Sequence, residues 1–303
     1  MDHVSQLLRG AVDLHIHAAP SLTPRSVDAW EALTQAAAAG MRGVLLKDHH
    51  GSTAPLAALV NRQAGISGCR LFGSVCLNHA VGGIQPAAAD AAIRFGASLV
   101  CLPTLSAANH HDYLNRFAPA AGTAASRAPV SGEAPIRLLD ADGNLTPPVR
   151  AVIDRVAASD AILATGHASP DEIRAVMRHA AHAGCRRILL THFPAYTTRD
   201  LHELGSMADL GPCFVELCLE MTVRDLPETC RFSHAQIAEY IRFFGPDRVV
   251  LSTDYGHARL PAPVEGLRSW IGELIGQGFR DEEIRTMTAR NPARLLGLEP
   301  DTE

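Results

Sequence analysis

Residues 10–48, GAVDLHIHAAPSLTPRSVDAWEALTQAAAAGMRGVLLKD, contain one complete strand–helix–strand repeat. Residues 10–16 and 42–48 are short apolar runs without strict alternation, which is typical of strands buried on both faces of a parallel sheet. Between them, residues 24–39 predict a helix with Pro24 in its first turn and Gly40 just after its end. The same alternation continues along the chain.

Six further apolar runs resemble these two strands: residues 70–77, 97–103, 161–166, 186–192, 213–219 and 248–254. Helical patterns fill the intervals at residues 54–64, 85–95, 147–159, 169–184, 199–209, 233–245 and 264–276. Eight such repeats predict an α/β fold, a single (β/α)8 TIM-type barrel over residues 1–303. A doubly wound open sheet is the alternative.

One connection is longer than the others. Residues 105–146 separate the fourth strand from the next helix, and Asp142–Gly143 lies there between short apolar runs, which is a hairpin signal. Because long loops in compact domains are usually functional, we expect residues 105–146 to form a lid over the carboxyl ends of the strands.

The composition narrows the class of protein. The 303 residues are 47% hydrophobic and 19% charged, with a formal net charge of −5, which argues against a nucleic-acid or polybasic membrane binder. Seven cysteines without a CxxC pair indicate free thiols, and neither a signal peptide nor an apolar run of ~18 residues is visible. We expect a cytoplasmic protein with a small-molecule substrate, and a homo-oligomer is compatible with this composition.

Polar residues gather at the predicted strand ends. His15 and His17 are two apart on the first strand, so their side chains point the same way, with Asp13 behind them. His167, His192 and Asp254 end later strands. Each has an ordinary alternative: a loop histidine, a buried histidine or a helix-capping aspartate. Together they form a ligand set for Zn²⁺, Mn²⁺ or Fe²⁺.

The order DLHIH, TGH, THF and STD resembles the amidohydrolase superfamily of metal-dependent hydrolases, which are (β/α)8 barrels. The segment from Asn291, NPARLLGL, is similar to the last helix of that superfamily. The KDHH and PT segments after strands two and four resemble an uncharacterised subgroup. The resemblance therefore implies a class of chemistry but no substrate.

The resemblance also implies roles for single residues. His15 and His17 would hold the more buried metal ion with Asp254, and His167 and His192 would hold a second ion. In members with one metal ion, His167 is the third histidine ligand and His192 faces the substrate. Asp254 would also accept the proton of the attacking water, a role that suits a carboxylate within hydrogen-bond reach.

One departure from the family concerns the group that bridges two metal ions. Members usually carry a carbamylated lysine or a glutamate at the end of strand four, but here that strand ends with residues 101–104, CLPT. Lys47, at the end of strand two, is the predicted substitute, because burial lowers the pKa of an amine and favours carbamylation. The alternative is that Lys47 pairs with Asp13 or Asp48.

Several further residues are predicted to contact substrate at the barrel mouth: His49, His50, His110, His111, Glu216 and His257. Glu216 is a charge within an apolar run and needs a partner or a ligand. The alternatives are solvated loop histidines, a salt-bridged glutamate and, for His49 and His50, metal ligation.

These observations predict a hydrolase with one or two divalent transition metal ions, Zn or alternatively Mn or Fe. It would use activated water against an amide, cyclic amide, lactone or phosphoester, with Asp254, His192 and Lys47 as catalytic residues. A one-metal decarboxylase or hydratase of the same superfamily and a non-catalytic metal-binding barrel are the alternatives. The sequence contains no P-loop and no GxSxG motif.

Overall fold

A computed structural model describes residues 2–117, 134–223 and 230–299. Eight strands pair in chain order: β1 (Val12–Ile16), β2 (Gly43–Leu46), β3 (Arg70–Cys76), β4 (Ala97–Cys101), β5 (Ile162–Ala164), β6 (Ile188–Leu190), β7 (Phe214–Cys218) and β8 (Val249–Ser252). Every neighbouring pair is parallel.

The sheet closes on itself just beyond the ends of β1 and β8. The Asp254 N–H donates to the His15 carbonyl at 2.7 Å, and the His17 N–H donates to the Tyr255 carbonyl at 2.7 Å. The predicted (β/α)8 barrel is therefore confirmed. These two hydrogen bonds also bring together the carboxyl ends of β1 and β8, which carry the densest polar motifs.

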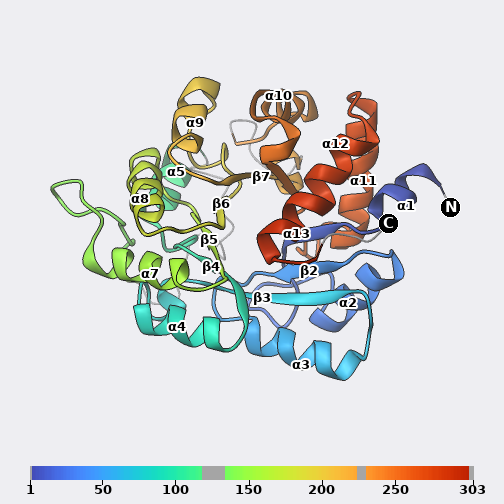
Figure 1. The fold of residues 1–303 in the computed structure, drawn as a ribbon, viewed down its shortest axis with the longest axis horizontal. Helices are drawn as coiled ribbons and strands as arrows, with labels where there is room; N and C mark the ends of the chain where they lie inside the picture. Colours follow the sequence, from blue (N-terminus) through green and yellow to red (C-terminus); the bar gives the residue numbers. More distant parts are fainter. Residues whose placement is uncertain (1, 118–133, 224–229, 300–303) are drawn as a thin grey trace.

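Helices surround the strands (Figure 1). The helices between strands are α2 (Ala29–Ala38), α3 (Ala54–Ala64), α4 (Pro86–Arg94), α5 (Ala108–Phe117), α7 (Pro147–Ala157), α8 (Pro170–His182), α9 (Leu201–Ala208) and α10 (His234–Phe244). α1 (His3–Leu8) precedes the barrel, and α11 (Pro263–Gly276), α12 (Asp281–Arg285), a π-helical turn (Thr286–Arg290) and α13 (Asn291–Leu296) follow it. Short 3-10 turns are η1 (His79–Val81), η2 (Leu219–Thr222) and η3 (Pro246–Arg248).

The apolar core has two parts. Inward side chains such as Leu14, Leu45, Leu99 and Ile162 fill the barrel interior, and a larger cluster packs the outer strand faces against the helices. The register of β1 against β2 shifts between Asp13 and Ile16. Since Leu14 lies in the interior and Ile16 in the outer cluster, this shift reverses the alternation of β1 near its end.

The helix predicted from Pro24 begins instead at Ala29. Asp28 caps it, because its side chain accepts the Glu31 N–H at 2.8 Å while the Glu31 carboxylate accepts the Asp28 N–H at 2.9 Å. Residues 24–26 are instead bonded to the loop that follows β8. They therefore form part of the barrel mouth.

Part of the predicted lid is described. The hairpin signal at Asp142–Gly143 is confirmed by an antiparallel bridge between Leu139 and Leu145 and by the Asp140 N–H donating to the Asn144 carbonyl at 2.8 Å. The Leu138 N–H donates to Glu172, which ties this segment to the start of α8. Residues 118–133 of the predicted lid lie outside the described residues, and the role of a lid stays a prediction.

Among the described residues, no helix is long and apolar enough to cross a membrane.

Candidate metal centre

Asp254 lies at the centre of the polar cluster at the carboxyl ends of the strands. Its Oδ1 is 3.0 Å from His15 Nε2 and 3.1 Å from His17 Nε2, and its Oδ2 is 4.0 Å from His192 Nε2. The ligand atoms of His15, His192 and Asp254 all lie within 4.8 Å of one another. Residues from β1, β6 and β8 therefore meet around one carboxylate, as their positions at strand ends predict.

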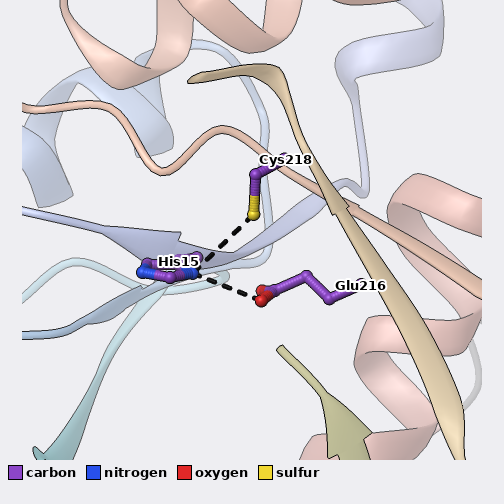
Figure 2. A group of neighbouring side chains, drawn as sticks. All are labelled: His15, Glu216 and Cys218. Carbon is purple, nitrogen blue, oxygen red and sulfur yellow. Dashed lines mark hydrogen bonds and ion pairs between the residues drawn. The ribbon is translucent and has the colours of Figure 1, made fainter. Parts of the chain in front are cut away.

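His15 uses both of its ring nitrogens. Figure 2 shows its Nδ1 facing Glu216 and Cys218, which both come from β7. Glu216 Oε2 is 3.3 Å from this nitrogen and Cys218 Sγ is 3.9 Å from it. A carboxylate on Nδ1 keeps a proton there and leaves Nε2 as the metal-binding nitrogen. The contacts at Nδ1 therefore orient the ring so that its Nε2 can bind a metal ion.

The backbone is strained at two residues of this cluster. In the described part of the chain, the non-glycine residues with positive φ are His192, at 29°, and Asp254, at 56°. Each is held by a hydrogen bond: the His192 N–H donates to Glu216 Oε2 at 3.1 Å, and the Asp254 N–H donates to the His15 carbonyl. Such conformations persist where surrounding structure imposes them, which is common at functional sites.

His167 lies beside His192, with ring centroids 4.8 Å apart. Its ring stacks on Tyr196 at 3.9 Å, and its Nδ1 is 2.8 Å from Nδ1 of His110. Gly166, with φ of +62°, allows this turn, because a Cβ there would lie 2.3 Å from the Leu102 carbonyl oxygen. Two of the predicted metal ligands, His167 and His192, therefore share one face of the mouth.

Lys47 follows β2 and is 2% exposed. Burial acts to lower the pKa of its amine, but Cys101, Cys76, Glu216 and Asp254 outweigh burial and raise that pKa. The expectation of a lowered pKa is therefore wrong, since it considered burial alone. Because carbamylation needs the neutral amine, the carbamate bridge stays a prediction.

The alternative pairing of Lys47 is also not seen. Lys47 forms no ion pair with either Asp13 or Asp48. Asp13 accepts hydrogen bonds from the Thr253 hydroxyl at 2.6 Å and from the His15 N–H at 3.1 Å, so it supports the backbone of the centre. Asp48 accepts from the Ser21 hydroxyl at 3.0 Å.

The protonation states suit metal binding. Burial lowers the pKa of His17 to about 4 and that of His192 to about 3, so both imidazoles are neutral at pH 7. Burial acts against ionisation of Asp254, yet His15 and His17 outweigh it and hold the pKa of that carboxyl well below its usual range. Nδ1 of His17 and of His192 and Oε1 of Glu216 are buried without a hydrogen-bond partner among the described residues. Burial acts to lower the pKa of His15, but Asp254 and Glu216 outweigh burial and raise that pKa to about 9, so a bound metal ion would displace a proton from this ring. The neutral imidazoles of His17 and His192 beside an ionised carboxylate fit a divalent transition metal ion.

The predicted substrate-binding residues separate into two groups. His49, His50, His111 and His257 are partly exposed, and the rings of His49 and His17 are 5.0 Å apart. His110 is 3% exposed and contacts His167. Glu216 is 0% exposed and lies beneath His15. The structure therefore corrects the prediction that Glu216 contacts substrate. It faces the predicted ligands instead.

Three residues of the barrel mouth are not predicted from the sequence. Tyr196 stacks on His167, Glu220 is 3.7 Å from His257, and Arg25 pairs through its backbone with the segment of His257. Tyr196 follows His192 by four residues, which is a weak signal. Arg25 lies within the helix predicted over residues 24–39, and Glu220 directly follows the strand predicted over residues 213–219, so neither gives a signal.

The described residues also line a cavity at the other end of the barrel. It has a volume of about 750 Å³ and lies at the amino ends of β5 to β8, against Asp160, Cys185, Arg248 and Arg294. The histidine cluster lies at the opposite, carboxyl ends, where barrel enzymes hold their sites. The candidate centre is therefore not this cavity.

The fold and the cluster define a class: a (β/α)8 barrel with a histidine–aspartate centre at its mouth. Its structural neighbours are members of the amidohydrolase superfamily, which confirms the resemblance at the level of the fold. An amidohydrolase from Pseudomonas aeruginosa has a TM-score of 0.63 at 12% identity, covering 97% of this chain and 98% of that chain. A probable dipeptidase from the same organism has a TM-score of 0.62 at 13% identity, covering 97% of each chain.

A probable 2-pyrone-4,6-dicarboxylic acid hydrolase from Acinetobacter baumannii has a TM-score of 0.57 at 11% identity, covering 95% of this chain and 100% of that chain. Residues 10–216 match the profile of a family of unknown function (DUF6282), and the chain belongs to that family. No curated protein matches the sequence.

Proposed function

We propose that this chain is a metal-dependent hydrolase of small molecules, acting on an amide, cyclic amide, lactone or phosphoester bond. The observation that carries the proposal is the position of Asp254, with Oδ1 3.0 Å from His15 Nε2 and 3.1 Å from His17 Nε2. Structural neighbours named as hydrolases support it. Residues 105–146 serve as the lid of this single-domain enzyme.

In this proposal His15, His17 and Asp254 would hold one divalent ion, Zn or alternatively Mn or Fe, and His167 and His192 would hold a second ion. Such an ion lowers the pKa of bound water toward about 7 and polarises the oxygen of the bond to be cleaved. Asp254 is ionised at neutral pH and accepts the proton of the attacking water. If the centre holds a single ion, His192 would face the substrate instead of binding metal.

A second candidate is a one-metal decarboxylase or hydratase of the same superfamily. The end of β4 offers Cys101 in place of a carboxylate or carbamate, and the raised pKa of Lys47 opposes a carbamate there. Metal stoichiometry separates the candidates: two ions per chain favour the binuclear hydrolase, and one favours this alternative. A Lys47→Ala variant that keeps two ions would show that Lys47 does not bridge them.

The test compares the wild type with Asp254→Asn. We expect one or two transition metal ions per chain, turnover on a panel of ester, amide, lactone and phosphoester compounds, and loss of turnover with a chelator. Asparagine tolerates positive φ, so the fold should survive while turnover falls about 10²–10⁴-fold. Metal content is measured on both proteins, because lost metal would mimic a lost base. Full activity in a metal-free preparation would refute the proposal.

A further inference from the structure

The connection between β1 and α2 fixes an arginine in the barrel mouth. Arg25 forms an antiparallel backbone bridge with His257. On either side of it, the Ser26 N–H donates to the Gly256 carbonyl at 2.9 Å and the Ala258 N–H donates to the Pro24 carbonyl at 3.2 Å. The backbone of Arg25 is therefore held against the loop that carries Asp254.

The guanidinium of Arg25 lacks a partner. Its Nε and Nη1 are buried without a hydrogen bond, and it forms no ion pair with any described carboxylate. The carboxylates that attract it most are Asp48, Asp254 and Glu220, in that order. All three lie near it without pairing with it.

The two strongest of these neighbours are engaged elsewhere. Asp48 accepts hydrogen bonds from the Ser21 hydroxyl at 3.0 Å and from the His50 N–H at 2.7 Å. Asp254 faces His15 and His17. A buried charged donor without an acceptor is costly, so this geometry favours an acceptor that comes from outside the chain.

Arg25 is also close enough to act on the centre itself. Its charge contributes to lowering the pKa of His17, of His49 and of His257, each of which is lowered chiefly by burial. A group bound to Arg25 therefore lies over the same mouth as the residues around Asp254.

We propose that Arg25 binds a carboxylate of the substrate, so that the hydrolysed compound is an anionic, carboxylate-bearing small molecule. This inference rests on the proposed function, whose substrate it narrows. A planar carboxylate matches the guanidinium geometry. A phosphate dianion is disfavoured, because the ionised Asp254 and Asp48 lie near this single cation and repel a second negative charge.

The first experiment compares two esters of equal carbon number, mono-4-nitrophenyl glutarate and 4-nitrophenyl valerate, on the metal-loaded protein. We expect the wild type to prefer the glutarate ester. Arg25→Met should lower kcat/KM for that ester about 10- to 100-fold, the range of a charge-assisted hydrogen bond, and lower kcat/KM for the valerate ester much less, so that the preference is lost. Arg25→Lys keeps the charge and should lose less.

Arg259→Met is the matched control, because it removes an exposed cation from the same loop and should leave the preference intact. Circular dichroism confirms that each variant is folded. An Arg25→Met variant with the wild-type preference, or a wild type without one, would overturn the inference.

The second experiment is independent of turnover. Calorimetry measures the binding of glutarate and of neutral glutaramide to the metal-loaded wild type and to Arg25→Met. We expect only glutarate binding to weaken, by about tenfold or more. If no compound of the ester, amide, lactone and phosphoester panel is hydrolysed but glutarate binding depends on Arg25, the carboxylate site at Arg25 stands and the proposed function falls. If esters are hydrolysed and neither preference nor glutarate binding depends on Arg25, the proposed function stands and the inference falls.

Discussion

Glu216 connects two residues that the chain places 177 positions apart, counted from His15 to His192. One carboxylate oxygen lies 3.3 Å from His15 Nδ1 and accepts the His192 N–H at 3.1 Å. Burial acts to raise its pKa, but His15 and Lys47 outweigh burial and lower that pKa to about 2. Glu216 therefore stays charged and orients both predicted ligands throughout the range in which proteins are stable.

We predict that Glu216→Gln weakens metal binding about 10- to 100-fold, because an amide is a poorer acceptor for His15 and holds its tautomer less firmly. Titration against a competing chelator measures the change. Cys218→Ser is the matched control on the same strand, since its sulfur is 3.9 Å from the same nitrogen and contributes little. Equal metal affinity in Glu216→Gln and the wild type would contradict this role.

At the scale of elements, the loop after β8 packs against the end of β1 more closely than any side chain would allow. Gly256 has φ of +132°, and a Cβ there would lie 1.8 Å from the His17 carbonyl oxygen. The contact holds the loop beside His17 and Asp254. Glycine is required for the close approach and for the backbone conformation together.

We predict that Gly256→Ala destabilises the fold by more than about 3 kcal/mol and weakens metal binding, because His17 must move. Gly278→Ala is the control: it also has positive φ, +83°, but its Cβ would meet no atom within 4 Å. It should cost about 1 kcal/mol, from the backbone conformation alone. Urea unfolding gives both values, and equal losses would show that the contact with His17 is unimportant.

At the scale of the whole molecule, the buried histidines make stability depend on pH. The pKa values of His17 and His192 are lowered by burial to about 4 and about 3, and burial lowers those of His49 and His167 well below 6.5. Between pH 4.5 and 6.5 the unfolded chain therefore binds protons at these four sites that the native chain does not. This difference in proton binding lowers the free energy of unfolding as the pH falls.

Two carboxyl groups act in the opposite direction. Burial raises the pKa of Asp13 to about 7 and that of Glu220 to about 8, so in the same range the native chain binds more protons at these two sites. Taken together, these six sites bind about two more protons in the unfolded chain than in the native chain. We predict that the chelated protein loses about 3 kcal/mol of unfolding free energy per pH unit on acidification below about pH 5.5, where nearly all of these histidines are protonated in the unfolded chain.

The matching variant is His192→Asn, because asparagine tolerates the positive φ at this position. It should reduce the slope by about 1.4 kcal/mol per pH unit, the contribution of one proton. Urea unfolding of the chelated proteins between pH 4.5 and 7.5 measures the slope, and the exposed His202→Asn serves as control. A slope unchanged by His192→Asn would show that this imidazole is protonated in the native chain.

The barrel and the place of its site follow from local sequence. Short hydrophobic runs without strict alternation, typical of strands buried on both faces, take turns with helical patterns along the chain. Parallel strands in this order bring their carboxyl ends together. The strand ends after β1, β6 and β8 therefore predict that His15, His17, His192 and Asp254 lie at one end of the barrel. In the structure the three histidines lie within 4.0 Å of the Asp254 carboxylate, and their binding of a metal ion stays a prediction. The start of α2 differs from the predicted start, because residues 24–26 bond to a loop more than 200 residues later.

What only the tertiary structure decides is how distant groups act on one another. The raised pKa of Lys47 depends on Cys76, Cys101 and Glu216, which no local pattern connects to it. The role of Glu216 beneath His15 and the unpaired guanidinium of Arg25 likewise depend on which side chains the barrel brings together. Periodicity is a property of neighbours along the chain, whereas electrostatic potential and hydrogen-bond satisfaction are properties of neighbours in space.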